Sequence, residues 1–249
     1  MDKEKSIQDK EKLIMEKTGC PCKIFEESDN VEEEVFQAYC EALERGKKEG
    51  FTPVILASDD DLEFWVSNLS DDDYSREEEI SKELEDGKNV LNERFKSYMQ
   101  DLEEDEEEWL HEICDEDWEE KFEDEGIINE FSFLGGEEIA LLEVPTKNPW
   151  EIIAWFPMGG WNECPWVDDM MAVSYYWYKK YRAFPAVITN DVLQYFVEHP
   201  VDDEKEALEL AKEHYAFCTD RLDQSTASGT LNEVADSLMN SKVWYFWWD

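Results

Sequence analysis

Apolar and polar positions in the first sixty residues predict two helices and two short strands. Residues 3–18 predict a charged helix, and residues 31–50 predict a helix with an apolar stripe that ends in two lysines and Gly50. Residues 21–25 and 51–57 are short apolar runs, which predict a strand before and after the second helix. A strand, a helix and a strand in this order predict a right-handed βαβ unit with parallel strands.

The second half of the chain contains more apolar runs and therefore predicts more strands. Their positions are 127–134, 138–144, 150–156, 183–190 and 243–248, with Gly135 and Gly136 forming a hairpin turn between the first two. Helical spacing predicts helices at 168–182, 204–215 and 231–240. The last strand is apolar on both faces, which is typical of a central strand. The order predicts an α/β (α+β) fold, in which one elaborated domain over residues 1–249 has a mixed β-sheet flanked by helices.

Acidic residues are concentrated in one segment of the chain. The 23 Lys+Arg and 65 Asp+Glu give a net charge of −42, and residues 59–125 hold 30 acidic and 6 basic side chains. Residues 75–100 predict one helix. Residues 101–125 predict an amphipathic helix with an acidic outer face, because apolar side chains recur at three- and four-residue steps: Leu110, Ile113, Cys114, Trp118 and Phe122. We interpret residues 59–127 as an acidic helical insertion.

Three interpretations of this insertion remain open. Its acidic face is solvated and aids solubility, or it mimics DNA and occupies a nucleic-acid-binding protein, or the aspartate runs at 59–61 and 71–73 bind Ca²⁺ or Mg²⁺. Neither run has the twelve-residue calcium-loop pattern. A surface of this charge repels nucleic acid and anionic lipid and attracts basic proteins. We therefore expect a basic protein partner, no nucleic-acid partner and no membrane partner.

The N-terminal residues are charged and no apolar run is as long as a membrane helix, so we expect a cytoplasmic protein. The six cysteines are then expected to be reduced thiols. Cys20 and Cys22 are spaced like half of a metal site, but no second Cys/His pair accompanies them at a suitable spacing. We expect no metal and no cofactor, and we interpret this pair as small buried thiols at the start of a strand.

Four aromatic-rich segments carry a resemblance to a known family. They lie at 150–155, 159–165, 176–181 and 243–249, with Gly-Gly-Trp-Asn-Glu-Cys-Pro in the second and Val-Trp-Tyr-Phe-Trp-Trp-Asp in the last. In these motifs residues 140–249 resemble an uncharacterised bacterial domain-of-unknown-function family. The resemblance implies a bacterial cytosolic protein and carries no established activity. Families of this kind often lie near toxin and immunity genes, which implies an interaction role.

Residues 159–165 form the strongest candidate site. Gly160 permits a left-handed backbone and the close approach of another group. Trp161 offers a flat apolar face, while Asn162 and Glu163 supply hydrogen-bonding groups and a charge. We interpret these four residues as candidates for ligand or partner binding, with Trp247 lining the same pocket. The alternative is a tight turn whose polar side chains cap the following helix.

Cys164 in the same segment is a candidate nucleophile. A cysteine nucleophile needs a base and a group that orients the base. His214 is the candidate base and Asp220 the candidate orienting group, although no local signature of cysteine hydrolases surrounds Cys164. Common phosphate-loop, metalloprotease and serine-hydrolase motifs are also missing from the sequence.

The leading functional hypothesis is a protein-interaction module, which in its immunity-type version neutralises a basic toxin. One alternative is an enzyme or small-ligand binder that uses the pocket around residues 161–164. Another is a DNA mimic. The sequence indicates neither the partner nor the oligomeric state.

Overall fold

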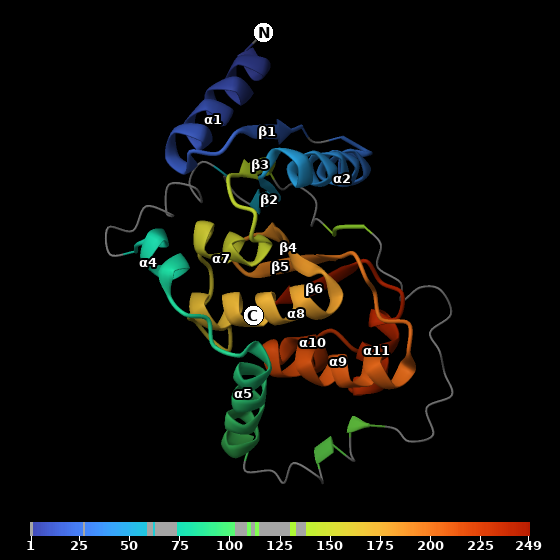
Figure 1. The fold of residues 1–249 in the computed structure, drawn as a ribbon. Coiled ribbons are helices and arrows are strands. Elements are labelled where there is room, and N and C mark those ends of the chain that lie inside the picture. Colours follow the sequence, from blue (N-terminus) through green and yellow to red (C-terminus); the bar gives the residue numbers. More distant parts are fainter. Residues whose placement is uncertain are drawn as a thin grey trace. The chain divides into compact units, whose positions relative to one another are not determined.

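The computed structural model describes residues 2–26, 28–58, 62, 74–102, 109–110, 113–114, 130–132 and 138–249. These residues form an α+β fold with a mixed β-sheet and helices (Figure 1). The strands are β1 (Cys22–Phe25), β2 (Thr52–Ser58), β3 (Glu138–Val144), β4 (Ala183–Ile188), β5 (Val192–Val197) and β6 (Val243–Trp247). The helices are α1 (Asp2–Thr18), α2 (Val31–Glu49), α4 (Arg76–Ser81), α5 (Gly87–Leu102), η1 (Pro149–Glu151), α7 (Ile152–Trp155), α8 (Val167–Tyr181), α9 (Glu204–Phe217), α10 (Asp220–Asp223) and α11 (Leu231–Leu238).

The chain divides into two compact units. The first comprises Met1–Lys82, Glu130–Met158 and Pro185–Gln194, and the second comprises Glu83–Asn129, Gly159–Phe184 and Tyr195–Asp249. The domain boundaries expected from the sequence, with an insertion at 59–127, stay a prediction. Among the helices that the structure describes, none combines the length and the apolar character that crossing a membrane requires.

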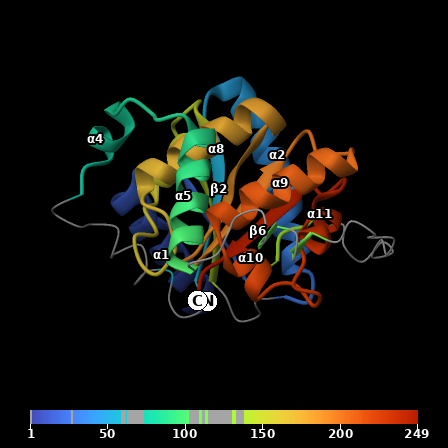
Figure 2. The ribbon, with the colours of Figure 1, turned by 90° about the horizontal axis from the view of Figure 1, so that it is seen from below.

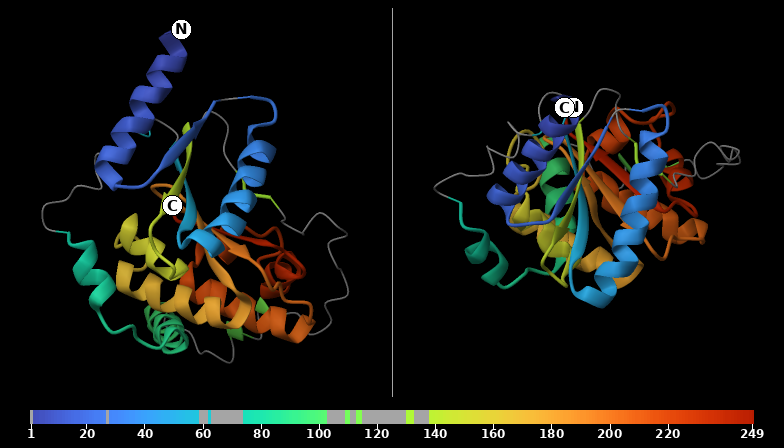
Figure 3. Two further views of the ribbon diagram at one scale, coloured as in Figure 1. Left: turned by 45° about the horizontal axis from the view of Figure 1, so that its top comes forward. Right: turned by 90° about the horizontal axis from the view of Figure 1, so that it is seen from above.

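In the first unit β3 lies between β1 and β2 and is antiparallel to both. Cys22 on β1 is opposite Leu142, and Ile55 on β2 is opposite Leu141. The helices α1 and α2 lie on opposite sides of these three strands (Figure 3). Because both outer strands run against β3, β1 and β2 run in the same direction, as predicted. They are not neighbours, however, so the predicted βαβ unit is split by a strand from much later in the chain.

The sheet order is β1-β3-β2-β4-β5-β6, with β2 and β4 parallel. Among the described strands β6 therefore stands at the end of the order, and the prediction of a central strand at 243–248 is wrong. Its apolar character has another cause. Trp244 and Phe246 are fully buried in an aromatic cluster with Trp177 and Phe217 from α8 and α9.

In the second unit α5 packs against α8 and α9, and α9 packs against α11 (Figure 2). Gly87 begins α5 at a point of close approach to α8, where an added Cβ atom would lie 2.3 Å from the carbonyl oxygen of Ala172. Five residues earlier, Lys82 ends α4 with an extended backbone. The predicted single helix over 75–100 is thus two helices, separated before Gly87.

The prediction of a strand at 150–156 is wrong, because these residues form η1 and α7. A short apolar run fits a buried helical turn as well as a strand. The informative signal was Pro149, which stands at the first position of η1, where a helix tolerates proline best.

Two further differences from the predicted strands concern β5 and residues 130–132, and part of the acidic segment lies outside the described residues. β5 was not expected from the sequence, and it carries the buried Gln194, whose side-chain amide donates to the carbonyl oxygen of Ser132 at 2.8 Å. Residues 130–132 are not a strand, while the rest of the strand predicted at 127–134 and its hairpin turn at Gly135 and Gly136 lie outside the described residues. Most of the acidic helix predicted at 101–125 also lies outside them.

Candidate functional site

The sequence motif at 159–165 forms a tight turn before α8, in the second unit. Gly159 and Gly160 have φ values of 91° and 74°, and Asn162 has a φ of 46°. The amide of Gly160 lies 3.2 Å from the carbonyl oxygens of both Cys164 and Pro165. A Cβ atom on Gly159 would lie 2.1 Å from the carbonyl oxygen of Pro165, so only glycine fits there without a shift of the backbone. The two glycines therefore allow the backbone of this turn to fold tightly.

Arg94 on α5 connects this turn to the end of α9. Its Nη2 donates to the carbonyl oxygen of Glu163 at 2.6 Å, and its Nε donates to the carbonyl oxygen of Ala216 at 3.1 Å. Burial lowers the pKa of the guanidinium, and the nearby Asp169 and Glu163 oppose that shift. Arginine stays protonated at neutral pH in proteins. The turn is thus held by a fixed charged donor rather than by its own hydrogen bonds alone.

The residues that follow β6 also reach the turn. The Asn162 side-chain amide donates to the main-chain oxygen of Asp249, and the Asp249 amide donates to Asp220 Oδ2 at 3.1 Å. The Cys218 thiol donates to the carbonyl oxygen of Trp247 at 3.1 Å. Asn162 thus binds the main chain beyond β6, and the alternative in which it caps α8 is not observed. Trp247, which was expected beside Trp161, is half-buried, and its carbonyl oxygen accepts from the Cys218 thiol.

Trp161 and Trp166 are both exposed at this turn. Their exposed fractions are 36% and 66%, and Met15 on α1, at 45%, is the other large apolar side chain exposed among the described residues. The ring of Trp166 lies against Gly160, since a Cβ atom there would lie 2.4 Å from the ring. Gly160 therefore leaves the space that the ring of Trp166 occupies. Asn162 and Glu163 are exposed beside them.

Three carboxylates lie close to the two tryptophans in the sequence. Glu163 belongs to the turn, and Asp168 and Asp169 occupy the first turn of α8, where carboxylates favour the positive end of the helix dipole. Burial and the neighbouring Asp168 raise the pKa of Asp169, while Arg94 opposes the shift. Residues 161–169 thus carry two exposed tryptophans and three carboxylates.

Cys164, the candidate nucleophile, is buried beneath this turn. Its exposed fraction is 4%, and burial strongly raises the pKa of the thiol. A raised pKa keeps the thiol protonated at neutral pH and lowers its reactivity, because the thiolate is the nucleophile. Asp220, the candidate orienting group, accepts from the Asp249 amide and from Gln224 Nε2.

The side chain of His214, the candidate base, lies among aromatic rings and makes no hydrogen bond to the described residues. Its ring centroid is 4.7 Å from that of Phe246, 4.8 Å from that of Trp244 and 5.3 Å from that of Trp177. Neither ring nitrogen has a hydrogen-bond partner. Burial lowers the pKa of His214 well below its ordinary value, with Arg221 adding to the shift. The three candidates for a triad are not linked by the hydrogen bonds that activate a nucleophile.

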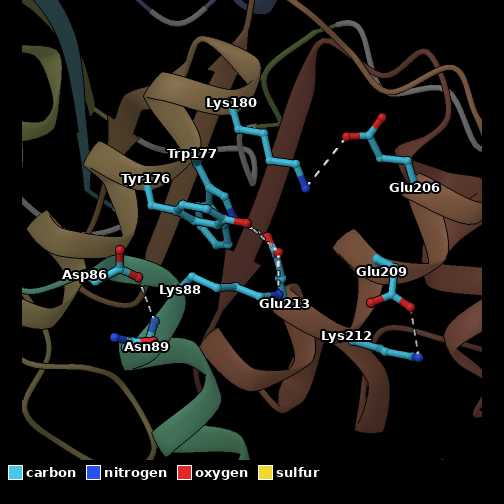
Figure 4. A network of polar contacts seen from close by, with 10 residues as sticks. All are labelled: Asp86, Lys88, Asn89, Tyr176, Trp177, Lys180, Glu206, Glu209, Lys212 and Glu213. Carbon is cyan, nitrogen blue, oxygen red and sulfur yellow. Dashed lines mark hydrogen bonds and ion pairs between the residues drawn. The ribbon is translucent and has the colours of Figure 1, made fainter.

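Glu213, which precedes His214 on α9, is a buried carboxylate that the sequence did not indicate as a candidate site residue (Figure 4). Its exposed fraction is 3%. Its Oε1 accepts from Tyr176 Oη at 2.9 Å and from Lys88 Nζ at 2.8 Å, and its Oε2 accepts from Trp177 Nε1 at 2.9 Å. Asp203 caps the start of α9, where its side chain accepts from the Glu206 amide.

Metal binding has no support within the described residues. No group of three His, Cys, Asp or Glu side chains that would hold an ion occurs among them. Burial raises the pKa of Cys20 to about 11 and that of Cys22 to about 12, so both are thiols at neutral pH. The aspartate runs at 59–61 and 71–73 lie outside the described residues, as does most of the segment on which a DNA mimic would depend.

Residues 140–249 match the model of a family described as "Domain of unknown function (DUF4253)". The matched range contains the turn at 159–166, α8, α9 and β6, and it is less than half of the chain. The match agrees with the resemblance to an uncharacterised domain family that the aromatic motifs indicated. Neither a curated protein nor a solved structure matches the chain.

Proposed function

We propose that this protein is a protein-binding module whose contact surface is the turn at residues 159–166. The observation that carries this proposal is the exposure of Trp161 and Trp166 on a turn that is bonded to Arg94 of α5 and to the main chain of Asp249. Tryptophan is enriched among the residues that dominate binding energy at protein interfaces. A rigid surface also loses less conformational entropy on binding than a flexible one.

The charge around the turn favours a basic partner. Glu163, Asp168 and Asp169 lie within three residues of Trp161 or Trp166 in the sequence, and the whole chain carries a net charge of −42. Charge complementarity of this kind raises association rates and selects against acidic partners. In the immunity-type version of the proposal, the basic partner is a toxin that the module neutralises.

A capture experiment with two matched variants tests this proposal. Tagged wild-type protein and a Trp161→Ala/Trp166→Ala variant are exposed to lysate of the native cell at low and at high salt, and captured proteins are identified by mass spectrometry. Met15→Ala is the control, because it removes the other exposed large apolar side chain, on α1 of the first unit. We expect a basic protein that the wild type and Met15→Ala retain and that the double variant loses.

The same partner should dissociate as salt rises, because exposed charge pairs are screened within about 8–10 Å at physiological ionic strength. The captured protein is then purified and its dissociation constant is measured for each variant. A partner that binds the double variant as tightly as the wild type would place the contact surface elsewhere. A partner whose affinity does not change with salt would remove the electrostatic part of the proposal.

A further inference from the structure

A second feature of the same unit is a pocket between α5 and α9, lined by side chains outside the turn. Its volume is about 210 Å³. Pockets that hold drug-sized ligands have volumes of about 300–1,000 Å³. The pocket therefore suits a smaller molecule.

Charged groups of both signs face this pocket. Lys88 lies on α5, while Glu209, Lys212 and Glu213 lie on α9. Lys88 pairs with Glu213 at 2.8 Å, and Lys212 pairs with Glu209 at 3.2 Å (Figure 4). The pocket thus holds two cations and two anions in a chain that is otherwise strongly acidic, and its polar lining is close to neutral.

The two ion pairs differ in what they can offer a ligand. The Glu213 side chain is 3% exposed and accepts hydrogen bonds from Tyr176 and Trp177 as well as Lys88, so its position is held. Lys88 is 41% exposed, and an ammonium has three donors, of which the bond to Glu213 takes one. Lys212 and Glu209 are 31% and 55% exposed. Breaking their ion pair so that each can contact a ligand costs little, because exposed ion pairs contribute about 0–1 kcal/mol.

The remaining wall of the pocket is apolar. It is formed by Leu91 and Phe95 of α5, Ala216 of α9 and Leu110. Phe95 is part of an aromatic group, with its ring centroid 5.7 Å from that of Trp109 and 6.4 Å from that of Tyr215. This wall would cover an apolar side chain of a ligand, as in most small-molecule sites.

We infer that this pocket binds a small zwitterion with an apolar side chain, that is, a free α-amino acid such as leucine or phenylalanine. A simple anion would face the carboxylates of Glu209 and Glu213, and a simple cation would face Lys88 and Lys212. A zwitterion places its carboxylate at the lysines and its ammonium at Glu209, and its zero net charge avoids repulsion by a chain of net charge −42. Asn92, which also lines the pocket, carries a donor and an acceptor for the same polar groups.

Isothermal titration calorimetry with a panel of related compounds tests this inference. The wild-type protein is titrated with L-leucine and L-phenylalanine, with N-acetyl-L-leucine, which lacks the ammonium, with L-leucinamide, which lacks the carboxylate, and with glycine, which lacks the side chain. We expect saturable binding of leucine or phenylalanine. The acetylated and amidated compounds should bind at least about tenfold more weakly, the effect of losing a hydrogen bond to a charged group. Glycine should also bind at least about tenfold more weakly, because it buries no apolar side chain. No saturable binding of either amino acid, or equal binding of the acetylated or amidated compound, would overturn the inference.

Two variants locate the binding. Lys212→Met and Glu209→Gln each remove one charge from an exposed pair and leave the buried network of Glu213 intact, so both proteins should fold. Lys47→Met is the control, because it removes the lysine from a comparable exposed pair with Glu44 on α2 of the first unit. We expect about tenfold weaker binding for the two pocket variants and unchanged binding for the control. Unchanged affinity in both pocket variants would overturn the assignment to this pocket.

An independent readout comes from the indole N–H of Trp177, which donates to Glu213. Its NMR resonance should shift on titration with leucine in the wild type. An unchanged resonance together with saturable heat would place the ligand elsewhere on the protein.

Discussion

Glu213 and His214 are neighbours on α9, and both are buried, but they have opposite surroundings. Glu213 accepts three hydrogen bonds, one of them from the ammonium of Lys88. His214 lies among Trp177, Trp244 and Phe246, and neither of its ring nitrogens has a partner. The burial of a polar side chain therefore does not indicate whether that side chain is hydrogen-bonded. A carboxylate is tolerated inside because donors surround it, and an imidazole is tolerated because it remains neutral.

The difference also separates two kinds of candidate chemistry. The His214 imidazole was the obvious base from the sequence, yet it is enclosed and has no hydrogen bond to pass a proton along. The Glu213 carboxylate was not suspected, yet it lies at a pocket with a half-exposed lysine beside it. A place in the lining of the pocket and a hydrogen-bonded lysine distinguish Glu213 from His214.

Glu213→Ala tests the hydrogen-bonded side of this contrast and should have the largest effect. We expect the free energy of unfolding to fall by about 3 kcal/mol, because the buried Trp177 Nε1 loses its acceptor and the packed carboxylate leaves a gap. Urea denaturation followed by circular dichroism measures the change. Glu209→Ala, one helical turn earlier, is the control, and because its pair with Lys212 is exposed it should lose no more than about 1 kcal/mol. Equal losses in the two variants would show that the three donors contribute little to stability.

His214→Phe tests the unpaired side of the contrast. We expect the free energy of unfolding at pH 7 to rise by about 1.5 kcal/mol, because two buried ring nitrogens without partners are replaced by carbon in an aromatic cluster. The same denaturation experiment measures it. His199→Phe, at an exposed position, should change stability by no more than about 0.5 kcal/mol. A clear loss in His214→Phe would mean that the imidazole nitrogens are satisfied in solution.

The pH dependence of stability gives a smaller effect from the same residue. The pKa of His214 is lowered in the folded state by burial, so between about pH 6.5 and the lower folded-state pKa the unfolded chain binds a proton that the folded chain does not. Stability should therefore fall with decreasing pH, by about 1 kcal/mol between pH 6.5 and pH 5.5 from this group alone.

Because many carboxylates also titrate in acid, the measurement is the difference between the wild type and His214→Phe at each pH. That difference should shift in favour of the variant as the pH falls through this window. A difference that stays constant from pH 7 to pH 5.5 would contradict a lowered pKa at His214.

The sequence pattern predicted the helices and strands whose signals lie within their own residues. The helices near 31–49 and 167–181 and the strands near 52–58 and 138–144 were predicted within a few residues, because periodicity and end signals lie in the segments themselves. The segment at 150–156 was not, because six apolar residues fit either a helical turn or a strand. The strand at 192–197 was missed, and its buried Gln194 depends on the distant Ser132 for its hydrogen bonds.

The features of the candidate site likewise divide into those that the sequence predicts and those that depend on packing. The sequence by itself determined that residues 159–165 form a glycine-dependent turn, since a glycine pair with a proline after it indicates a tight turn. It also determined that this turn carries a tryptophan, an asparagine and a glutamate. Only the tertiary structure decided that Arg94 holds this turn, that Trp166 covers Gly160 and that His214 is enclosed by rings. The same is true of Glu213, whose partner Lys88 lies 125 positions away in the chain. Sequence periodicity assigns a residue to the face of an element, whereas the group that meets that face is set by how the elements pack.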